Sequence, residues 1–595
     1  MIKKLLKSVR EFRLASILTP LFMVGEVVME VIIPLLMTNL VDNGIEGNDG
    51  AGDLNVILLM GGALTVCCII SLMAGFAGAK SGAHAAMGFA RNLRKDMYYR
   101  IQNFSFSNID KFSTASLVTR LTTDVTRVQD AYQMILRIAV RAPIMLIFSL
   151  IMSFIINVEL SLVFVAVIPV LAIGLILIMR RVHPVFERVF KRYDTLNNMV
   201  QENVSGMRVV KAFVREDQQI KKFRGISGDI YKDFTFAEKT LAFNAPLMQL
   251  CAYGGMIAIS WLGANLIVFD ETLTTGQLMA LITYAMQILM NLMMLSMIFV
   301  MVTMSRASAE RICEVLDEES DITNPAESPV TEVADGSVEF RNVKFEYKKG
   351  SGKYALSDIN ISIKSGETVG IIGGTGSSKS TLVQLIPRLY DVSEGSVLVG
   401  GRDVREYDIE ALRDAVAVVL QKNTLFSGTI KDNLQWGKLN ATDEEMEEAC
   451  RLAQADGFIR EFPDGYDTYI EQDGNNVSGG QKQRLCIARA LMKHPKILIL
   501  DDSTSAVDTA TDAKIRKAFR EKIPDTTKLI IAQRISSVMD ADRILVLDGG
   551  RITDFGTHDE LMKSSEIYRE VYESQQKGSE SVDEAAASLA KGGEE

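Results

Sequence analysis

The nine residues GGTGSSKST, at positions 373–381, decide the fold of the C-terminal half of this chain. A phosphate-binding loop is written G-x-x-x-x-G-K-[ST], because the N–H groups of such a loop and the helix N-terminus after it attract phosphate oxygens. The stretch fits this pattern except at Ser378, which stands where the second glycine belongs. ETVGIIGG before it is typical of a buried strand, and KSTLVQLIPRLY after it is typical of a helix. This order of strand, loop and helix predicts a nucleotide site in an α/β P-loop domain.

A second apolar strand, ILILDD at 497–502, ends in two adjacent carboxylates. At such a site Lys379 can reach the β- and γ-phosphates, and Ser380 can ligate magnesium. Asp501 is placed to hold the magnesium shell, and Asp502 can orient the water that attacks the γ-phosphate. The expected ligands are therefore a nucleoside triphosphate and Mg²⁺.

Between the loop and this strand lies a third motif, VSGGQKQRLCIARAL, at residues 477–491. Ser478, Gly479 and Gly480 stand at the start of a predicted helix, where free N–H groups attract anions. This second anion site need not serve the same nucleotide as the loop at 373–381.

The composition of the chain indicates two different environments. Its 595 residues exceed the usual size of one domain. The chain is 48% hydrophobic yet 23% charged, and residues 1 to about 305 carry the long apolar runs. The formal net charge of −10 gives no support to a nucleic-acid role. We expect a membrane domain and a soluble α/β domain in one polypeptide.

Six segments are long and apolar enough to cross a bilayer as helices, which takes about 20 residues each. The short connections between them contain no Lys or Arg, whereas the long stretches 82–137 and 180–240 are rich in both. The positive-inside rule therefore places both termini and both long loops in the cytoplasm. The predicted spans lie near 14–41, 54–81, 138–157, 159–180, 243–269 and 274–304.

The two long loops carry helical periodicity with charged faces. We expect the membrane helices to continue into the cytoplasm and to turn back near Ile109–Ser116 and Arg215–Lys222. Two independent cytoplasmic insertions are the alternative, which the lack of turn-rich linkers disfavours. A signal peptide is the alternative for the basic N-terminus, but the apolar run there continues to about Leu40.

Two pairs of charged residues lie in or beside predicted spans, where charge is costly. Glu26 and Glu30 stand four residues apart, hence on one helical face, and Arg137 and Arg141 do the same. Glu26 and Arg141 lie at similar depth, each roughly 24 Å below the outer end of its helix at about 1.5 Å per residue. We expect a structural ion pair between these helices. The functional alternative is that Glu26 or Glu30 selects a cationic cargo.

The sixth span is rich in methionine, with eight between residues 279 and 304. Methionine adapts its shape and suits promiscuous apolar surfaces, although helix packing against lipid explains any single one equally well. As a group, these methionines favour a hydrophobic or amphiphilic cargo.

In this order, the motifs resemble those of an ATP-binding cassette (ABC) exporter half-transporter of the multidrug and lipid kind. The resemblance covers about residues 10–575 and rests on the phosphate loop, the VSGGQ signature and the six preceding spans. It implies six transmembrane helices, extended into the cytoplasm and fused to an α/β P-loop nucleotide-binding domain. It also implies ATP-driven export by alternating access across a bacterial plasma membrane. The implied parts are a membrane domain at 1–305, a connector at 306–335, the nucleotide-binding domain at 336–575 and a disordered acidic tail at 576–595.

The resemblance assigns roles to particular residues. Tyr347, 26 residues before Gly373, would stack on adenine, the alternative being an ordinary strand tyrosine. Ser478 to Gln481 would bind the γ-phosphate held by the opposite subunit, and Asp508 would lie on the loop between the two sites. The implied ATP ligands are Tyr347, Gly373, Gly374, Thr375, Gly376, Ser377, Ser378, Lys379, Ser380, Thr381 and Gln421, and the implied magnesium ligands are Ser380, Gln421 and Asp501.

The chain departs from this family at three positions. Ser378 replaces the loop glycine, Asp502 replaces the usual catalytic glutamate, and Gln533 replaces the switch histidine. Aspartate is one methylene shorter than glutamate and misplaces the water, and glutamine cannot carry the charge of an imidazolium. Asp502 and Gln533 together resemble the degenerate-site subunit of heterodimeric exporters, which implies a second, non-identical half-transporter and catalysis mainly at the partner's site. A homodimer with low turnover and an ATP-gated channel or regulator are the alternatives.

Overall fold

The structure is a computed structural model that describes residues 1–47, 52–503 and 506–576. The chain forms two compact units. The first comprises Met1–Gln102 and Thr114–Glu318, and the second comprises Asn103–Ser113 and the chain from Glu319 onward. The predicted tail lies, from residue 577 on, outside the described residues, and the domain boundaries at 305 and 335 stay predictions.

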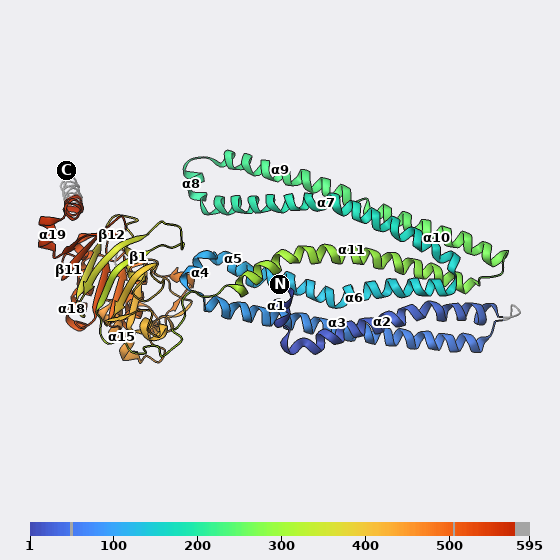
Figure 1. Ribbon diagram of the computed structural model, residues 1–595, viewed down its shortest axis with the longest axis horizontal. Coiled ribbons are helices and arrows are strands. Elements are labelled where there is room, and N and C mark those ends of the chain that lie inside the picture. Colours follow the sequence, from blue (N-terminus) through green and yellow to red (C-terminus); the bar gives the residue numbers. More distant parts are fainter. Residues whose placement is uncertain (48–51, 504–505, 577–595) are drawn as a thin grey trace. The chain divides into compact units, whose positions relative to one another are not determined.

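The first unit is helical, and within the described residues it holds six helical segments long and apolar enough to cross a membrane (Figure 1). Three of its helices, α3, α7 and α11, have 49, 48 and 43 residues. Such helices are roughly 65–75 Å long at about 1.5 Å per residue, more than twice the hydrocarbon core. The predicted six spans that continue beyond the bilayer are thus confirmed. The membrane helices are α2 (Arg13–Asn39), α3 (Leu54–Gln102), α6 (Val125–Ile156), α7 (Val158–Ser205), α10 (Asn244–Val268) and α11 (Thr275–Asp317).

The turn of the second long loop lies earlier than predicted. A turn was expected at Arg215–Lys222, but most of that segment already belongs to α9 (Glu216–Leu241). The chain turns instead around the short helix α8 (Met207–Ala212) and at Val214, whose φ is +52°. Acidic side chains in the first turn of α9 favour a helix start there. The other short helices of this unit are α1 (Ile2–Lys7) and α5 (Thr114–Thr119), with π-helical turns at Leu40–Glu46 and Arg120–Asp124.

Glycines let α2 and α3 approach each other closely. A Cβ at Gly78 would overlap the Met23 side chain, and a Cβ at Gly82 would lie 3.1 Å from Thr19. Small residues at such positions let helix backbones pack tightly in a membrane. The two helices therefore form one closely packed pair.

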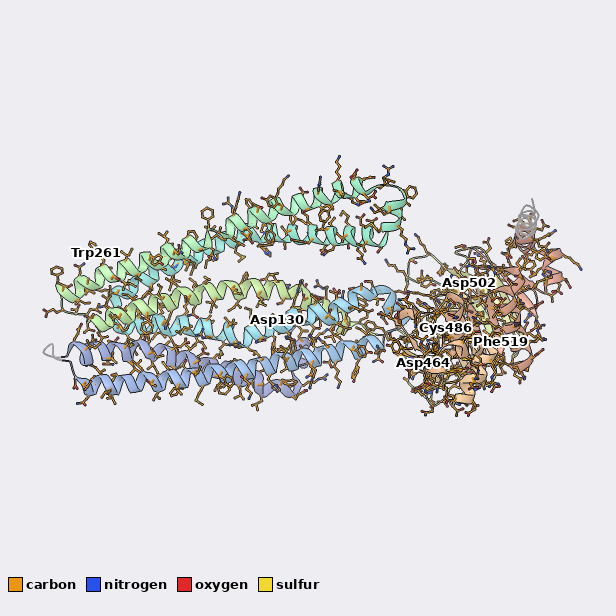
Figure 2. All side chains as sticks on the ribbon, turned by 180° about the vertical axis from the view of Figure 1, so that it is seen from behind. Asp130, Trp261, Asp464, Cys486, Asp502 and Phe519 are labelled. Atoms are coloured by element: carbon orange, nitrogen blue, oxygen red, sulfur yellow. The ribbon has the colours of Figure 1, made fainter. Side chains whose placement is uncertain are left out.

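The helices α2, α6 and α11 share a buried apolar core in the first unit. Tyr284 of α11 is fully buried there, and its hydroxyl donates to the carbonyl of Val31 at 2.6 Å, which satisfies its polar end. Outward side chains are apolar as well: Leu72 of α3 is 73% exposed, as expected where lipid covers a helix. Trp261 on α10, marked in Figure 2, is also exposed, and tryptophan is enriched at membrane interfaces.

The second unit is an α/β domain built on a six-stranded sheet of order β12-β11-β3-β10-β9-β6. The strands are parallel except β12, which pairs antiparallel with β11. A four-stranded antiparallel sheet has the order β2-β1-β4-β5, and a short ribbon joins β7 and β8. The strands are β1 (Val338–Phe345), β2 (Leu356–Ile363), β3 (Thr368–Ile372), β4 (Glu394–Val399), β5 (Arg402–Asp403), β6 (Val416–Val419), β7 (Gly428–Thr429), β8 (Tyr469–Ile470), β9 (Ile497–Asp501), β10 (Thr527–Ile531), β11 (Arg543–Asp548) and β12 (Arg551–Gly556).

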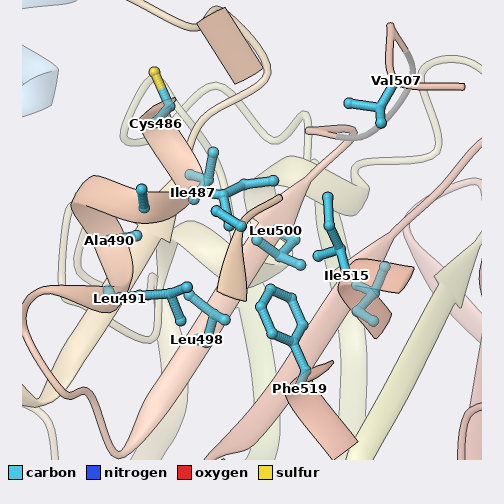
Figure 3. Packing of buried hydrophobic residues seen from close by; sticks show 14 of the residues in the cluster. Cys486, Ile487, Ala490, Leu491, Leu498, Leu500, Val507, Ile515 and Phe519 are labelled. Carbon is cyan, nitrogen blue, oxygen red and sulfur yellow. The ribbon is translucent and has the colours of Figure 1, made fainter. Parts of the chain in front are cut away.

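Helices cover this sheet, so its central strands are continuous apolar runs without alternation. All five residues of β9 are buried. Figure 3 shows Leu498 and Leu500 of β9 in one cluster with Ile487 and Leu491 of α17 and Phe519 of α18. The helices of the unit are α4 (Phe106–Lys111), α12 (Lys379–Gln384), α13 (Ile409–Ala415), α14 (Ile430–Gln435), α15 (Asp443–Leu452), α16 (Asp456–Glu461), α17 (Gly479–Leu491), α18 (Thr509–Lys522) and α19 (His558–Ser564).

Candidate active site

The phosphate loop joins β3 to α12. β3 lies between β11 and β10 in the sheet, and the loop leaves its carboxyl end, where parallel sheets place their ligand sites. Gly373 is the first residue after β3. A side chain has no room at this position, because a Cβ there would overlap the carbonyl oxygen of Leu547. Since α12 begins at Lys379, the predicted order of strand, loop and helix is confirmed.

Ser378 adopts a left-handed backbone conformation, with φ 72° and ψ 27°. Glycine takes this conformation freely, whereas a residue with a Cβ is disfavoured there by about 1–2 kcal/mol. Gly376, two residues earlier, has a φ of +82°. The loop therefore keeps its turn, with backbone strain at the position where the motif has glycine.

Lys379 folds back over the loop. Its Nζ donates to the carbonyl oxygens of Gly373 and Gly374, both at 2.8 Å. Burial lowers the pKa of Lys379, and the nearby carboxylates of Asp501 and Asp502 oppose that shift. The ammonium group thus lies within the loop, where it can exchange these carbonyls for phosphate oxygens.

Ser380 and Asp501 meet at the carboxyl end of β9. The Ser380 hydroxyl donates to Oδ1 of Asp501 at 3.0 Å. Burial raises the pKa of Asp501, and the Ser380 hydrogen bond opposes the shift. A hydroxyl and a carboxylate oxygen side by side are hard ligands, which suit Mg²⁺ when phosphate oxygens and waters complete its shell. Among the described residues there is no cluster of three or more His, Cys, Asp or Glu side chains that could hold a metal alone. Ser380 and Asp501 therefore fit a magnesium ion that is bound together with a nucleotide.

Asp502, marked in Figure 2, is held by two glutamine side chains. Nε2 of Gln533 donates to Oδ2 of Asp502 at 2.6 Å, and Gln421 also hydrogen-bonds to this carboxylate. Burial raises the pKa of Asp502, and these two hydrogen bonds oppose the shift. The contact between Gln421 and Asp502 was not predicted, because nothing in the spacing of two distant residues reveals it.

Tyr347 lies two residues beyond the end of β1, so it is outside the strand. Its hydroxyl shares a hydrogen bond with Oγ1 of Thr381 at 2.8 Å. The rings of Phe345 and Tyr390 meet it edge-on, with centroid distances of 4.9 and 5.4 Å. Tyr347 is nevertheless 53% exposed, so much of its ring is open to a flat base. The interpretation as an ordinary strand tyrosine does not fit this position.

The signature segment begins α17 with a capping box. The N–H of Ser478 donates to Oε1 of Gln481 at 2.9 Å, and the Ser478 hydroxyl accepts from the Gln481 N–H at 3.3 Å. A Cβ at Gly480 would lie 2.9 Å from the carbonyl oxygen of Ala506, and Gly479 stands just before it in the first turn. No hydrogen bond of the described residues joins this segment to the loop at 373–381. The loop and the signature thus lie apart in this unit, and anion binding at each of them stays a prediction.

Asp508 is the N-cap of α18. Its side chain accepts from the N–H of Thr511 at 2.9 Å, and these hydrogen bonds lower the pKa of Asp508. Residues 504 and 505 of the same stretch lie outside the described residues. The predicted loop between two ATP sites is therefore described only in part.

Three of the charged residues predicted in the spans, Glu26, Glu30 and Arg141, meet between α2 and α6. Nη2 of Arg141 donates to both carboxylate oxygens of Glu30 at 2.7 Å, and its Nε lies 3.6 Å from Glu26. Arg137, one turn earlier on α6, lies against α3, with its Cδ 3.1 Å from where a Cβ of Gly82 would be. The geometry is that of an ion pair between two helices. A role for Glu26 or Glu30 in cargo selection stays a prediction.

Known proteins share this arrangement. Residues 16–293 match the family described as the ABC transporter transmembrane region, and residues 356–505 match the family described as ABC transporter. The chain is 37% identical, over 97% of its length and 100% of the relative, to the uncharacterized ABC transporter ATP-binding protein YfiB of Bacillus subtilis. It is 33% identical to the ATP-dependent lipid A-core flippase of Desulfotalea psychrophila, over 82% of this chain and 84% of that protein. A bacterial Atm1-family ABC exporter with ATP bound has a similar fold, with a TM-score of 0.80 and 24% identity. The match covers 95% of this chain and 99% of that chain.

The fold and the site thus define a membrane transporter with a fused ATP-hydrolysing domain. The chain belongs to the ATP-binding cassette transporter family. It is an integral membrane protein whose nucleotide-binding domain binds ATP and couples ATP hydrolysis to transport. Exporters of this family are membrane-embedded dimers, so a second half-transporter completes the working unit.

Proposed function

We propose that this chain is the degenerate-site half of a heterodimeric exporter. Its own site, with Lys379, Ser380 and Asp501, binds ATP with Mg²⁺ and turns over slowly. The competent site combines the signature segment Ser478–Gln481 of this chain with the phosphate loop of a non-identical partner. The observation that carries the proposal is the hydrogen bond of 2.6 Å between Gln533 and Asp502.

This contact supports slow chemistry for two physical reasons. Hydrolysis needs a group that positions the attacking water against the γ-phosphate. The Asp502 side chain is one methylene short of glutamate and is held by amide donors, and a misplacement of about 1 Å can cost on the order of a hundredfold in rate. The Gln533 amide supplies a hydrogen bond but no positive charge for the oxygens that become more negative in the transition state.

Nucleotide binding is supported by the remaining geometry. Lys379 and the Ser380–Asp501 pair keep the groups that hold phosphates and magnesium. Tyr347 offers an open ring for adenine, and Gln421 joins the site through Asp502. Ser378 weakens phosphate binding by the loop without abolishing it, because the backbone strain is confined to this one residue.

The proposed cargo is hydrophobic or amphiphilic. Methionines on α11 support this, since Met290 and Met297 are 69% and 62% exposed and can adapt to varied shapes. The relative named as a lipid A-core flippase also acts on a lipid, by its name. The arrangement of Lys and Arg supports cytoplasmic termini, and the bacterial relatives support a location in a bacterial plasma membrane.

Two measurements test the subunit assignment. A second, non-identical half-transporter should co-purify with the tagged chain when it is extracted from its native membrane in mild detergent. Mass spectrometry identifies this partner. With the catalytic carboxylate of that partner neutralised, single-turnover hydrolysis in the complex should be slow. An active particle that contains only this chain would replace the heterodimer by a homodimer, and rapid hydrolysis by the unaltered chain would overturn the degenerate site.

Uptake of the amphiphilic dye Hoechst 33342 into inside-out vesicles tests the transport assignment. Uptake should require ATP and should vanish when Lys379→Ala is combined with the matching change in the partner. ATP binding without dye uptake, for this dye and for other amphiphiles, would favour an ATP-gated channel or regulator.

A further inference from the structure

Tyr390 lies at the centre of an aromatic cluster in the second unit and is only 9% exposed. Its ring meets Phe345 at a centroid distance of 5.5 Å and Tyr347 at 5.4 Å, the latter at an angle of 87°. Phe106 of α4 meets the same ring at 5.9 Å and 65°. Tyr390 therefore touches both the tyrosine proposed for adenine and the short helix α4.

The hydroxyl of Tyr390 is bonded to α4 as well. It donates to Oδ2 of Asp110 at 2.6 Å. Burial and the Asp110 carboxylate raise the pKa of Tyr390, so the hydroxyl keeps its proton and remains a donor. Hydrogen bonds to an ionised acceptor are about twice as strong as neutral ones, so this contact is a firm link between Tyr390 and α4.

α4 has further anchors within the same unit. The hydroxyls of Ser105 and Ser107 donate to Oδ1 of Asp321 at 2.5 and 2.8 Å, and the amide of Asn108 donates to the carbonyl of Glu319 at 3.1 Å. Ser105 and Asn108 also form a capping box at the start of the helix. These anchors hold α4 in the unit without Tyr390, so altering Tyr390 should change how firmly α4 is held and not whether it stays in place.

Tyr347 has three supports. Its hydroxyl is bonded to Thr381 on α12, and its ring rests edge-on against Phe345 in one contact and Tyr390 in another. Aromatic contacts depend on the angle between the rings, so a ring that stacks on a base must hold one orientation. Removing the Tyr390 ring would leave a gap of a whole phenol beside Tyr347, and its ring could then tilt.

We propose that Tyr390 is a positioning residue for ATP, which holds Tyr347 in the orientation that receives adenine and, through Asp110, ties that orientation to α4. The inference rests on the proposed adenine role of Tyr347. It is independent of whether the site hydrolyses ATP. By linkage, the factor by which a docked α4 tightens ATP binding equals the factor by which ATP stabilises the docked α4.

The first experiment compares ATP with inorganic tripolyphosphate on the full-length protein in lipid nanodiscs. Tripolyphosphate offers its charge to the phosphate loop but has no base. Tyr390→Leu should weaken ATP binding roughly three- to tenfold, as expected for the loss of an aromatic pair, and should leave tripolyphosphate affinity unchanged. Tyr390→Phe keeps the ring and should keep most of the ATP affinity. Tyr568→Phe is the matched control, because Tyr568 is fully buried and its hydroxyl bonds to His558 elsewhere in the unit.

Three outcomes decide this test. Unchanged ATP affinity in Tyr390→Leu would overturn the proposal, and so would equal losses for ATP and tripolyphosphate, which indicate damage to the loop. Tyr347→Ala separates the inference from the function on which it rests. If Tyr347→Ala leaves ATP affinity unchanged, the adenine role fails. A loss in Tyr347→Ala without a loss in Tyr390→Leu removes only the role of Tyr390.

The second experiment follows amide hydrogen exchange over residues 105–111. In the unaltered chain, ATP with Mg²⁺ should slow exchange in this segment, and tripolyphosphate with Mg²⁺ should not. Tyr390→Phe should reduce the effect of ATP, because the bond to Asp110 is lost while the ring contact with Phe106 remains, whereas Tyr568→Phe should keep it in full. Equal slowing by both ligands, or an ATP effect of undiminished size in Tyr390→Phe, would overturn the link to α4.

Discussion

Nε2 of Gln533 lies 2.6 Å from Oδ2 of Asp502 and donates to it, just beyond the carboxyl ends of the neighbouring strands β10 and β9. The donor is an uncharged amide, and the acceptor is the carboxylate placed to face an attacking water. A histidine at position 533 could bring a positive charge to the same contact. The difference between these two donors leads to the first prediction.

Asp502→Glu together with Gln533→His, in a chain that also carries Ser378→Gly, should raise hydrolysis at this site. Positioned acid–base groups contribute roughly 10²–10⁴-fold, so a rise within that range is expected in single-turnover measurements. The partner's catalytic carboxylate is neutralised so that only this site is observed. Either substitution alone should do much less, because the two residues act as a unit. No rise in the triple variant would contradict the assignment of these two residues.

Ser378→Gly should tighten ATP binding at this site. Glycine lets the backbone approach the phosphates closely, which tightens ATP binding, whereas relief of the left-handed strain, about 1 kcal/mol, stabilises the fold with and without ATP. Hydrolysis should change little, because Asp502 and Gln533 remain. The control is Asn342→Gly, an exposed position on β1 with a φ of +48°, which should stabilise the fold without changing ATP affinity. Equal gains in affinity from both variants would show that the effect is not local to the loop.

Ser478→Ala should reduce the steady-state ATPase of the complex far more than Asp502→Asn does. Ser478 stands in the segment proposed to complete the competent site, and its hydroxyl also caps α17, a contact worth about 1 kcal/mol. Asp502→Asn alters only the slow site. Ser478→Thr keeps a capping hydroxyl and separates the loss of the cap from the loss of the site. Comparable losses from Ser478→Ala and Asp502→Asn would argue that the two sites are equivalent.

Glu30→Gln should lower the thermal stability of the membrane unit and leave the range of transported dyes unchanged. It removes the counter-ion of Arg141, which costs about 3–5 kcal/mol for a fully buried pair and less for these side chains, each 27% exposed. An altered dye range with unchanged stability would instead support a glutamate that selects cationic cargo.

Glu367→Gln should destabilise the second unit at pH 7 and less so in acid. Both carboxylate oxygens of Glu367 are bonded to the guanidinium of Arg543, which joins the starts of β3 and β11. Burial raises the pKa of Glu367, but Arg543 and the Lys364 N–H outweigh burial and hold that pKa below its ordinary value. A lowered pKa adds stability above the unfolded-state value of about 4.3, and this stability is lost as the pH falls through the folded value. Thermal unfolding of the unaltered chain and the variant from pH 7 downward measures the difference, and a difference that does not shrink with falling pH would contradict the electrostatic origin.

The parts of this protein that carry strong local patterns were predictable from sequence. A membrane helix must bury about 20 apolar residues, so hydropathy alone located the six spans. The phosphate loop was recognisable because Lys379 and Ser380 follow glycines at a set spacing after an apolar strand. The turn at Arg215–Lys222 was misplaced because helix ends depend on single residues, here the left-handed Val214.

Contacts between distant residues could not be predicted in the same way. By resemblance Gln421 and Gln533 belong to the ATP site, but their contacts with Asp502 were not predicted, because only the parallel order of β6, β9 and β10 brings both side chains to it. Likewise, Asp110 lies in a short polar stretch that the pattern assigned to a turn. Asp110 belongs to the second unit because it contacts Tyr390 there, and a single sequence does not reveal such a contact.

The place of α4 in the second unit has a consequence for how the protein is made. Asp110 and its partner Tyr390 are 280 residues apart in the chain. At the usual pace of synthesis, about 5–20 residues per second, α4 waits roughly 15–60 seconds before Tyr390 leaves the ribosome. During that interval the face of α4 that meets Tyr390 has no native partner, although the helices on either side can already enter the membrane. The second unit is therefore completed late, because one of its pieces is synthesised long before the residue to which it bonds.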